Sequence, residues 1–259
     1  MMGNDRNLIP EFENLYETKD WEHILAKSSE SPQDPEIQYY RALAMQQLHQ
    51  FYEAIKVFES IYTHVGVLKE IDYNLGLCHY HLNNIDQAIE YLRRYMYSSP
   101  SHPSIYFHLV KVMLIKNLHA DIDDVCERAV VSRSKKIPYR IWAYSLYKLK
   151  KYKEAHEKCL LILDKNKEEH SVWFLLGKVL RKCKYIKESR AALEKCCSLD
   201  PENLKYKKKY ESLITKISTK PEYSSQKPKI QLDTPILPKQ SAIKFAENRG
   251  CEDLFCLLF

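Results

Sequence analysis

A short pattern recurs along this chain at a nearly fixed interval. It consists of an aromatic or aliphatic residue, then polar residues, then a small residue at the start of an amphipathic stretch. It is found at Phe51-Tyr52-Glu53-Ala54, Ile85-Asp86-Gln87-Ala88, Tyr152-Lys153-Glu154-Ala155 and Tyr185-Ile186-Lys187-Glu188-Ser189. Ala54 and Ala88 are 34 residues apart, Ala88 and Ala155 are 67 apart, and Ala155 and Ser189 are again 34 apart. The long gap fits two units, of which one is degenerate and has Ile122 at the matching place. A period of about 34 residues predicts a stack of similar structural units.

Glycine usage narrows the fold class further. The chain has 5 glycines in 259 residues, although glycine supplies the positive-φ turns of hairpins, phosphate-binding loops and dinucleotide folds. Neither G-x-G-x-x-G nor G-x-x-x-x-G-K-[ST] occurs. We therefore expect an all-α protein and not a β-sandwich, a Rossmann domain or a P-loop protein.

Small residues recur where the two helices of one unit would touch. They lie on the predicted first helices (Ala42, Gly76, Ala143, Gly177) and second helices (Ala54, Ala88, Ala155). Large apolar residues at helical spacing give each helix one apolar face. A single hairpin cannot bury such a face, so neighbouring hairpins are expected to stack into a solenoid.

With this period and these small residues, the chain resembles the tetratricopeptide repeat (TPR) family over most of its length. The resemblance is clearest in the fifth unit, which contains Trp173, Leu176, Gly177, Leu180, Ser189, Leu193, Cys196 and Pro201. It implies a right-handed α-solenoid of about five units, at residues 35–68, 69–102, 103–135, 136–169 and 170–203. The third unit departs from the pattern, because Val110 and Ile122 replace small residues. We expect these larger side chains to open that hairpin or shift its stacking.

Further segments flank the five units. Residues 1–34 look like a partial N-terminal repeat, residues 204–218 like a capping helix, and residues 219–259 like a flexible tail rich in Pro and Lys. The capping helix carries Lys205, Lys207, Lys208 and Lys209. We interpret these lysines as a solvated face, with a docking patch as the alternative.

In TPR proteins the first helices line a concave groove that receives peptides or partner helices, and the resemblance implies the same here. Helical spacing predicts that the groove is lined by Tyr39, Leu43, Tyr73, Leu77, Tyr80, Phe107, Lys111, Leu114, Arg140, Tyr144, Tyr147, Lys148, Phe174, Lys178, Arg181 and Lys182. The N-terminal half of this set is aromatic and apolar, and the C-terminal half is basic and aromatic. Cations in a groove favour anionic partners, so an acidic or aromatic peptide or helix is the expected ligand.

The net charge of +6 is unevenly distributed. Residues 204–259 hold 11 of the 40 basic residues and 6 of the 34 acidic residues, so the preceding repeats are nearly neutral. The nearly neutral charge of the repeats argues against a nucleic-acid-binding surface on them. An RNA-binding helical repeat is therefore kept only as an alternative function.

The sequence ends in Cys256-Leu257-Leu258-Phe259, which matches the C-a-a-X prenylation pattern. Cys251 would provide a second lipid site, which matters because one chain binds membranes weakly. The other reading is an apolar tail that packs on the protein or on a partner. Without a signal peptide or an 18-residue apolar run, we expect a cytoplasmic protein, located on the cytosolic face of a membrane if it is lipidated.

No arrangement of residues predicts catalysis, a metal site or a cofactor. His79 and His81 lie two residues apart on one helix and so do not face each other. Asp121, Asp123 and Asp124 suit a helix N-terminus. The eight cysteines include no C-x-x-C pair, and most are expected to be reduced core residues. We therefore predict a non-enzymatic interaction scaffold without a small-molecule substrate. The alternatives are the RNA-binding repeat and a bacterial effector lipidated in a host cell.

Overall fold

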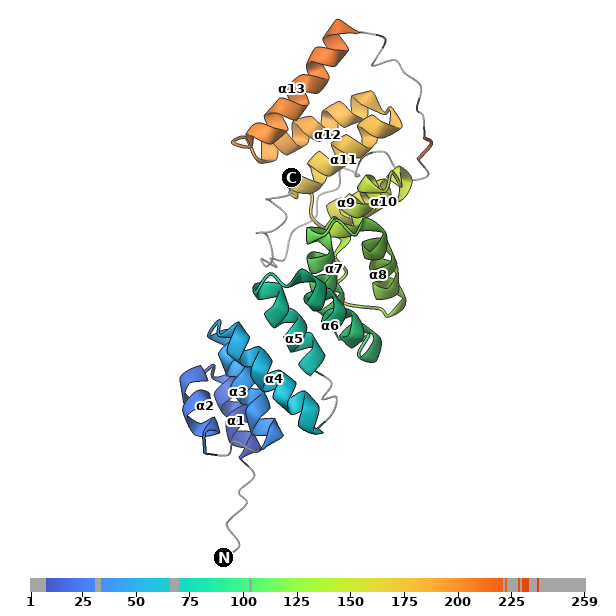
Figure 1. The fold of residues 1–259 in the computed structure, drawn as a ribbon. Coiled ribbons are helices and arrows are strands. Elements are labelled where there is room, and N and C mark those ends of the chain that lie inside the picture. Colours follow the sequence, from blue (N-terminus) through green and yellow to red (C-terminus); the bar gives the residue numbers. More distant parts are fainter. Residues whose placement is uncertain are drawn as a thin grey trace, which may run out of the picture. The chain divides into compact units, whose positions relative to one another are not determined.

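The computed structural model describes residues 8–30, 34–65, 70–102 and 104–220, together with a few positions between 222 and 237. Within these residues it contains thirteen α-helices and no strand. Figure 1 shows the ribbon with these helices labelled. The helices are α1 (Ile9–Glu17), α2 (Trp21–Ser28), α3 (Pro35–Gln47), α4 (Phe51–Val65), α5 (Ile71–His81), α6 (Ile85–Ser98), α7 (Ile105–Ile115), α8 (His119–Val131), α9 (Tyr139–Lys148), α10 (Tyr152–Lys165), α11 (His170–Cys183), α12 (Ile186–Leu199) and α13 (Leu204–Thr219). The expected all-α helical-repeat fold is confirmed.

The turn inside each helical hairpin repeats the same backbone geometry. A non-glycine residue with positive φ follows the first helix of each hairpin, at Lys19, His49, Asn83, Asn117, Lys150 and Lys184. From His49 onward these residues recur at intervals of 34, 34, 33 and 34. The amide of the following residue closes the turn. In the last hairpin the Tyr185 N–H donates to the Leu180 carbonyl at 2.9 Å. A bond to the carbonyl five residues earlier is the 6→1 bond of a Schellman motif. The period seen in the sequence is thus also a period of the backbone.

Two glycines lie where first and second helices meet, as predicted. A Cβ atom built on Gly76 would lie 2.6 Å from Cγ of Leu92, and one on Gly177 would lie 2.7 Å from Cγ of Leu193. Both distances are far shorter than a carbon–carbon contact. The Ser189 hydroxyl also donates to the Gly177 carbonyl at 2.7 Å. The predicted close approach of α5 to α6 and of α11 to α12 is confirmed.

The chain forms two compact units, which are described separately. Unit 1 comprises residues 1–118 and 127–137, and unit 2 comprises residues 119–126 and 138–259. The boundary runs through α8, the second helix of the repeat in which Val110 and Ile122 replace small residues. Both side chains are fully buried. That they open this hairpin stays a prediction.

In unit 1 the hairpins stack in sequence order. Helices α1 and α2 bury Phe12 and Ile24 against α3, and α3 packs on α4. Helix α4 then packs on α5, α5 on α6, and α6 on α7. Phe58 and Leu75 lie in the core that α3, α4 and α5 share. The helices at the predicted partial N-terminal repeat therefore contribute to the core.

In unit 2, α9 packs on α10, α10 on α11, α11 on α12, and α12 on α13. Helix α13 begins at Asn203, whose side chain accepts from the Tyr206 N–H at 3.4 Å, and it buries Tyr206 and Leu213. Covering the last repeat with a helix is typical of repeat proteins.

Two sequence predictions concern residues outside this description. The lipidation motif, with Cys251 and Cys256, lies beyond the described residues, as does most of the predicted tail. Among the described helices none is long and apolar enough to cross a membrane. None of the six described cysteines forms a disulfide, and five of them are buried.

Candidate peptide-binding surface

In unit 1, five of the predicted groove residues lie on α5 and α7. They are Tyr73, Leu77, Tyr80, Phe107 and Lys111, all partly buried. The Lys111 ammonium lies 5.3 Å from the centre of the Tyr80 ring, within the range of a cation–π contact. This surface is aromatic and apolar with a single lysine, as the sequence predicts for the N-terminal half.

Other residues predicted for this surface serve packing instead. The Tyr39 hydroxyl donates to the Glu70 carboxylate at 3.0 Å and accepts from the Asn74 amide at 3.1 Å. Burial, followed by the charge of Glu70, raises the pKa of Tyr39. The placement of Leu43 and Leu114 in the groove is wrong, because these side chains are 7% and 3% exposed and belong to the core.

Sequence reasoning missed a cluster of rings behind Tyr73. Its hydroxyl lies 2.8 Å from Nδ1 of His108, and its ring packs against Tyr95 and His102. Burial lowers the pKa of His108 to about 4 and raises that of Tyr73 to about 12, so both side chains are neutral at pH 7. The cluster fixes α5 against α7 without adding charge.

In unit 2 a lysine is surrounded by aromatic rings. The Lys178 ammonium, on α11, lies 4.8 Å from the ring centre of Tyr147, 5.4 Å from that of Phe174 and 6.0 Å from that of Tyr144. Burial, and then the nearby cations on α9, α11 and α13, lower the pKa of Lys178 to about 8. Lys148 also lies over the Tyr144 ring, at 5.8 Å. Five residues predicted for the C-terminal half, Tyr144, Tyr147, Lys148, Phe174 and Lys178, thus lie close together.

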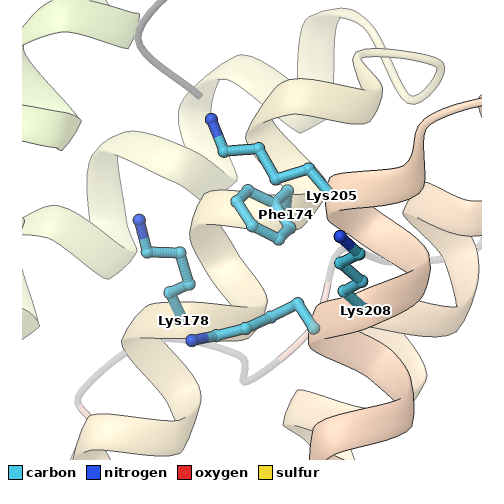
Figure 2. A pocket seen from close by; sticks show the side chains of 5 residues that line it. Phe174, Lys178, Lys205 and Lys208 are labelled. Atoms are coloured by element: carbon cyan, nitrogen blue, oxygen red, sulfur yellow. The ribbon is translucent and has the colours of Figure 1, made fainter.

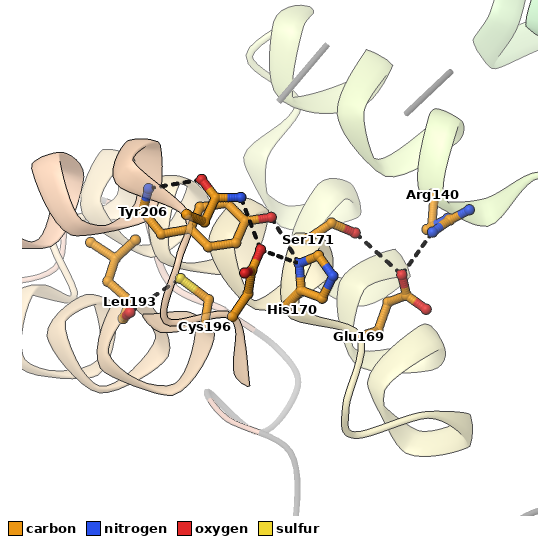
Figure 3. A network of polar contacts seen from close by, with 9 residues as sticks. Arg140, Glu169, His170, Ser171, Leu193, Cys196 and Tyr206 are labelled. Atoms are coloured by element: carbon orange, nitrogen blue, oxygen red, sulfur yellow. Dashed lines mark hydrogen bonds and ion pairs between the residues drawn. The ribbon is translucent and has the colours of Figure 1, made fainter. Parts of the chain in front are cut away.

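Two members of that predicted set take structural contacts. Arg140 donates to the Glu169 carboxylate at 2.7 Å, and Ser171 donates to the same carboxylate at 3.3 Å (Figure 3). Phe174 is only 3% exposed, and its ring lies 4.8 Å from that of Tyr206 on α13. Arg140 and Phe174 therefore support the surface more than they present groups to a ligand.

A pocket of about 310 Å³ lies between α11 and α13, and Figure 2 shows its walls. It is lined by Phe174, Lys178, Lys205, Lys208 and Lys209. Three of the four lysines interpreted as a solvated face of the capping helix thus line a pocket, and Lys207 does not. The sequence contained this signal, because positions 205, 208 and 209 follow the i, i+3, i+4 spacing of one helix face.

Asp123 has a structural role that the sequence did not reveal. The Trp142 indole N–H donates to its carboxylate at 2.7 Å, and the Lys151 ammonium donates to it at 2.6 Å. The aspartate is 7% exposed. This carboxylate joins α8 to the α9–α10 hairpin within unit 2.

The described residues hold no group of three metal-binding side chains. His79 is 5% exposed and stacks on Tyr91 with ring centres 5.3 Å apart. Burial raises the pKa of the Cys78, Cys159 and Cys196 thiols and that of Cys183, the last to about 11. These shifts lower their reactivity at neutral pH.

Family models of the tetratricopeptide repeat match residues 70–102 and residues 170–203. Among solved structures, YrrB, described as a TPR protein with an unusual peptide-binding site, is 10% identical. That alignment has a TM-score of 0.65 and covers 73% of this chain and 97% of YrrB. A TPR-containing protein of Cytophaga hutchinsonii is 14% identical, with a TM-score of 0.65 over 83% of this chain and 91% of that one. Naa15/Naa10 bound to HypK-THB is 15% identical, with a TM-score of 0.56 over 86% of this chain and 36% of that one. Among curated protein sequences none matches significantly.

These matches agree with the fold and with the repeat seen in the sequence. The chain is a tetratricopeptide repeat protein. As such it is a scaffold for protein interaction.

Proposed function

We propose that this protein binds an acidic segment of a partner protein, peptide or helix, on the surface that α9 and α11 form in unit 2. The observation that carries the proposal is the position of Lys178 among the rings of Tyr144, Tyr147 and Phe174. Partly buried cations backed by aromatic rings attract carboxylates, and the two partly exposed tyrosine rings provide apolar contact for aromatic or aliphatic neighbours.

The charge of this surface supports an anionic ligand. Lys148 and Arg181 are among the cations that lower the pKa of Lys178, so several positive charges lie near the Lys178 ammonium. Bringing acidic side chains there relieves this repulsion. The solved structure of YrrB, described as having a peptide-binding site, is a precedent for peptide recognition on this fold.

The test is a binding measurement with two labelled peptides, one alternating glutamate with phenylalanine and one alternating lysine with phenylalanine. We expect saturable binding of the acidic peptide only. Arg181→Glu should weaken it by about tenfold, since charged groups in recognition sites contribute on that scale. Arg190→Glu, an equal charge change at an exposed position of α12, is the matched control and should have little effect.

Arg140→Glu is a poor test, because it would place two carboxylates together at Glu169 and disturb the fold. Equal binding of both peptides, or equal effects of Arg181→Glu and Arg190→Glu, would refute the proposal. Strongly salt-dependent retention of RNA in a filter-binding assay, in place of peptide binding, would favour the RNA-binding alternative. The lipid tether predicted at Cys251 and Cys256 stays a prediction.

A further inference from the structure

The pocket between α11 and α13 concentrates positive charge in a small volume. Four of its five lining residues are lysines. Within the described part of the chain, no ion pair joins Lys205, Lys208 or Lys209 to a carboxylate. Like charges held close together are unfavourable. A bound anion would offset that cost.

The walls of the pocket are held in place from behind. Tyr206, next to Lys205, packs its ring on Phe174, and its hydroxyl lies 2.9 Å from Nδ1 of His170 (Figure 3). Asn203 caps α13 and also donates to Asp200 at 3.0 Å. The backbone that carries the lysines is thus fixed to the last repeat before any ligand binds. Such preorganisation reduces the entropy lost on binding.

The number of charges and the size of the pocket favour a compact, doubly charged anion. A phosphate monoester carries about −1.5 to −2 charges at pH 7 and three acceptor oxygens, whereas a carboxylate carries one charge. Lysine binds phosphate as a point charge, and several lysines around one pocket fit three oxygens. A nucleic-acid backbone would need an extended basic stripe, but the repeats preceding α13 are nearly neutral.

We propose that the pocket lined by Phe174, Lys178, Lys205, Lys208 and Lys209 binds the phosphate of a phosphorylated serine or threonine in the partner segment. This inference rests on the proposed function, because the phosphate would be carried by the acidic segment that binds α9 and α11. Phosphorylation of the partner would then switch binding from weak to strong.

The proposal predicts a pH profile that separates phosphate from carboxylate. The charges that face Lys178 are Lys148 on α9, Arg181 on α11, and Lys205 and Lys209 on α13, and with burial they lower its pKa to about 8. An anion favours protonated lysine, so affinity should fall as the pH rises above about 8. Below about pH 6 the phosphate takes up its second proton, so affinity should fall again. A glutamate ligand has its pKa near 4.3 and should show no loss between pH 7 and about 5.5.

The experiment compares three acidic 12-residue peptides that differ only at a central residue: serine, glutamate or phosphoserine. Calorimetry with the full chain should show the phosphoserine peptide binding about tenfold more tightly than the serine peptide, as a charge-assisted contact would give. Lys208→Glu should abolish this gain. Lys207→Glu, the same charge change one position away and outside the pocket, should preserve it.

Circular dichroism should show that the variants fold, and Lys205→Gln provides a milder second test with a partial loss of the gain. Equal affinity for the three peptides, or a gain that survives both Lys205→Gln and Lys208→Glu, would overturn the phosphate site but leave the proposed function standing. No binding of any acidic peptide would instead refute the proposed function. Vesicles containing phosphoinositide that bind more tightly than the phosphoserine peptide would overturn the assignment to a protein ligand.

Discussion

Replacing Gly177 with alanine should destabilise unit 2, although alanine is the better helix former. The added Cβ would lie 2.7 Å from Cγ and 2.8 Å from Cδ2 of Leu193, whose side chain is 1% exposed and has little room to move. The change from glycine to alanine inside a helix contributes about 1 kcal/mol of stability. Overpacking a well-filled core costs about 1–3 kcal/mol. We therefore expect a net loss of up to about 2 kcal/mol in the free energy of unfolding.

A double-mutant cycle separates the steric cost of the added Cβ atom from the gain in helix propensity. Leu193→Ala removes the atoms that the new Cβ would meet, and by itself should cost about 2–5 kcal/mol. In that background Gly177→Ala should stabilise the unit by about 1 kcal/mol, because only the helix propensity remains. The sign of the effect should thus reverse, with a coupling energy of about 1–3 kcal/mol, which is the steric cost of the new Cβ atom.

The assay is urea unfolding followed by tryptophan fluorescence in a Trp21→Phe background. The remaining tryptophans, Trp142 and Trp173, both lie in unit 2, so the signal reports on the unit that contains the substitution. If Gly177→Ala stabilises the otherwise unchanged protein, or if the two substitutions are additive, then close helix approach is not the reason for glycine at this position.

Three further predictions concern single positions. Asp123→Ala should destabilise unit 2 by about 2–3 kcal/mol, because the buried Trp142 N–H loses its acceptor; an unchanged urea midpoint would contradict this. Lys184→Gly should stabilise unit 2 by about 0.5–1 kcal/mol, since φ at this position is 72°, whereas Lys182→Gly, inside α11, should destabilise it. Because the pKa of His108 is about 4 in the fold and near 6.5 when unfolded, the unfolded chain binds more protons between these values, and stability should fall as pH drops from about 6.5 to 4. His108→Gln should reduce that fall, and identical pH slopes for the two proteins would contradict the assignment.

The repeat fold could be predicted because it rests on local, periodic features. Small residues such as Gly76 and Gly177 mark helix contacts, and they do so in the sequence itself. The lysines at the turns, such as Lys150 and Lys184, were missed because their side chains do not favour positive φ. Only His49, Asn83 and Asn117 are of types enriched there.

The candidate site was predictable only in part. Helical spacing places Tyr144, Tyr147 and Lys178 on one surface, but it does not reveal which side chains are taken up by neighbouring helices. Arg140 pairs with Glu169, which is 29 residues away, and Phe174 is covered by Tyr206. The lysines of α13 were interpreted as a solvated face, and Lys205, Lys207 and Lys208 are indeed exposed. Sequence spacing fixes the face of a helix but does not show that a pocket with α11 lies beside it.

The central claim is that the α9, α11 and α13 surface of unit 2 binds an acidic segment. The most direct measurement is photo-crosslinking of the full chain with a phosphorylated acidic peptide that carries a photoreactive phenylalanine, followed by mass spectrometry. The account predicts crosslinks on these three helices, close to Tyr147, Lys178 and Lys208, which disappear when excess unlabelled peptide competes. Crosslinks confined to unit 1, or crosslinks in unit 2 that the unlabelled peptide does not reduce, would contradict it.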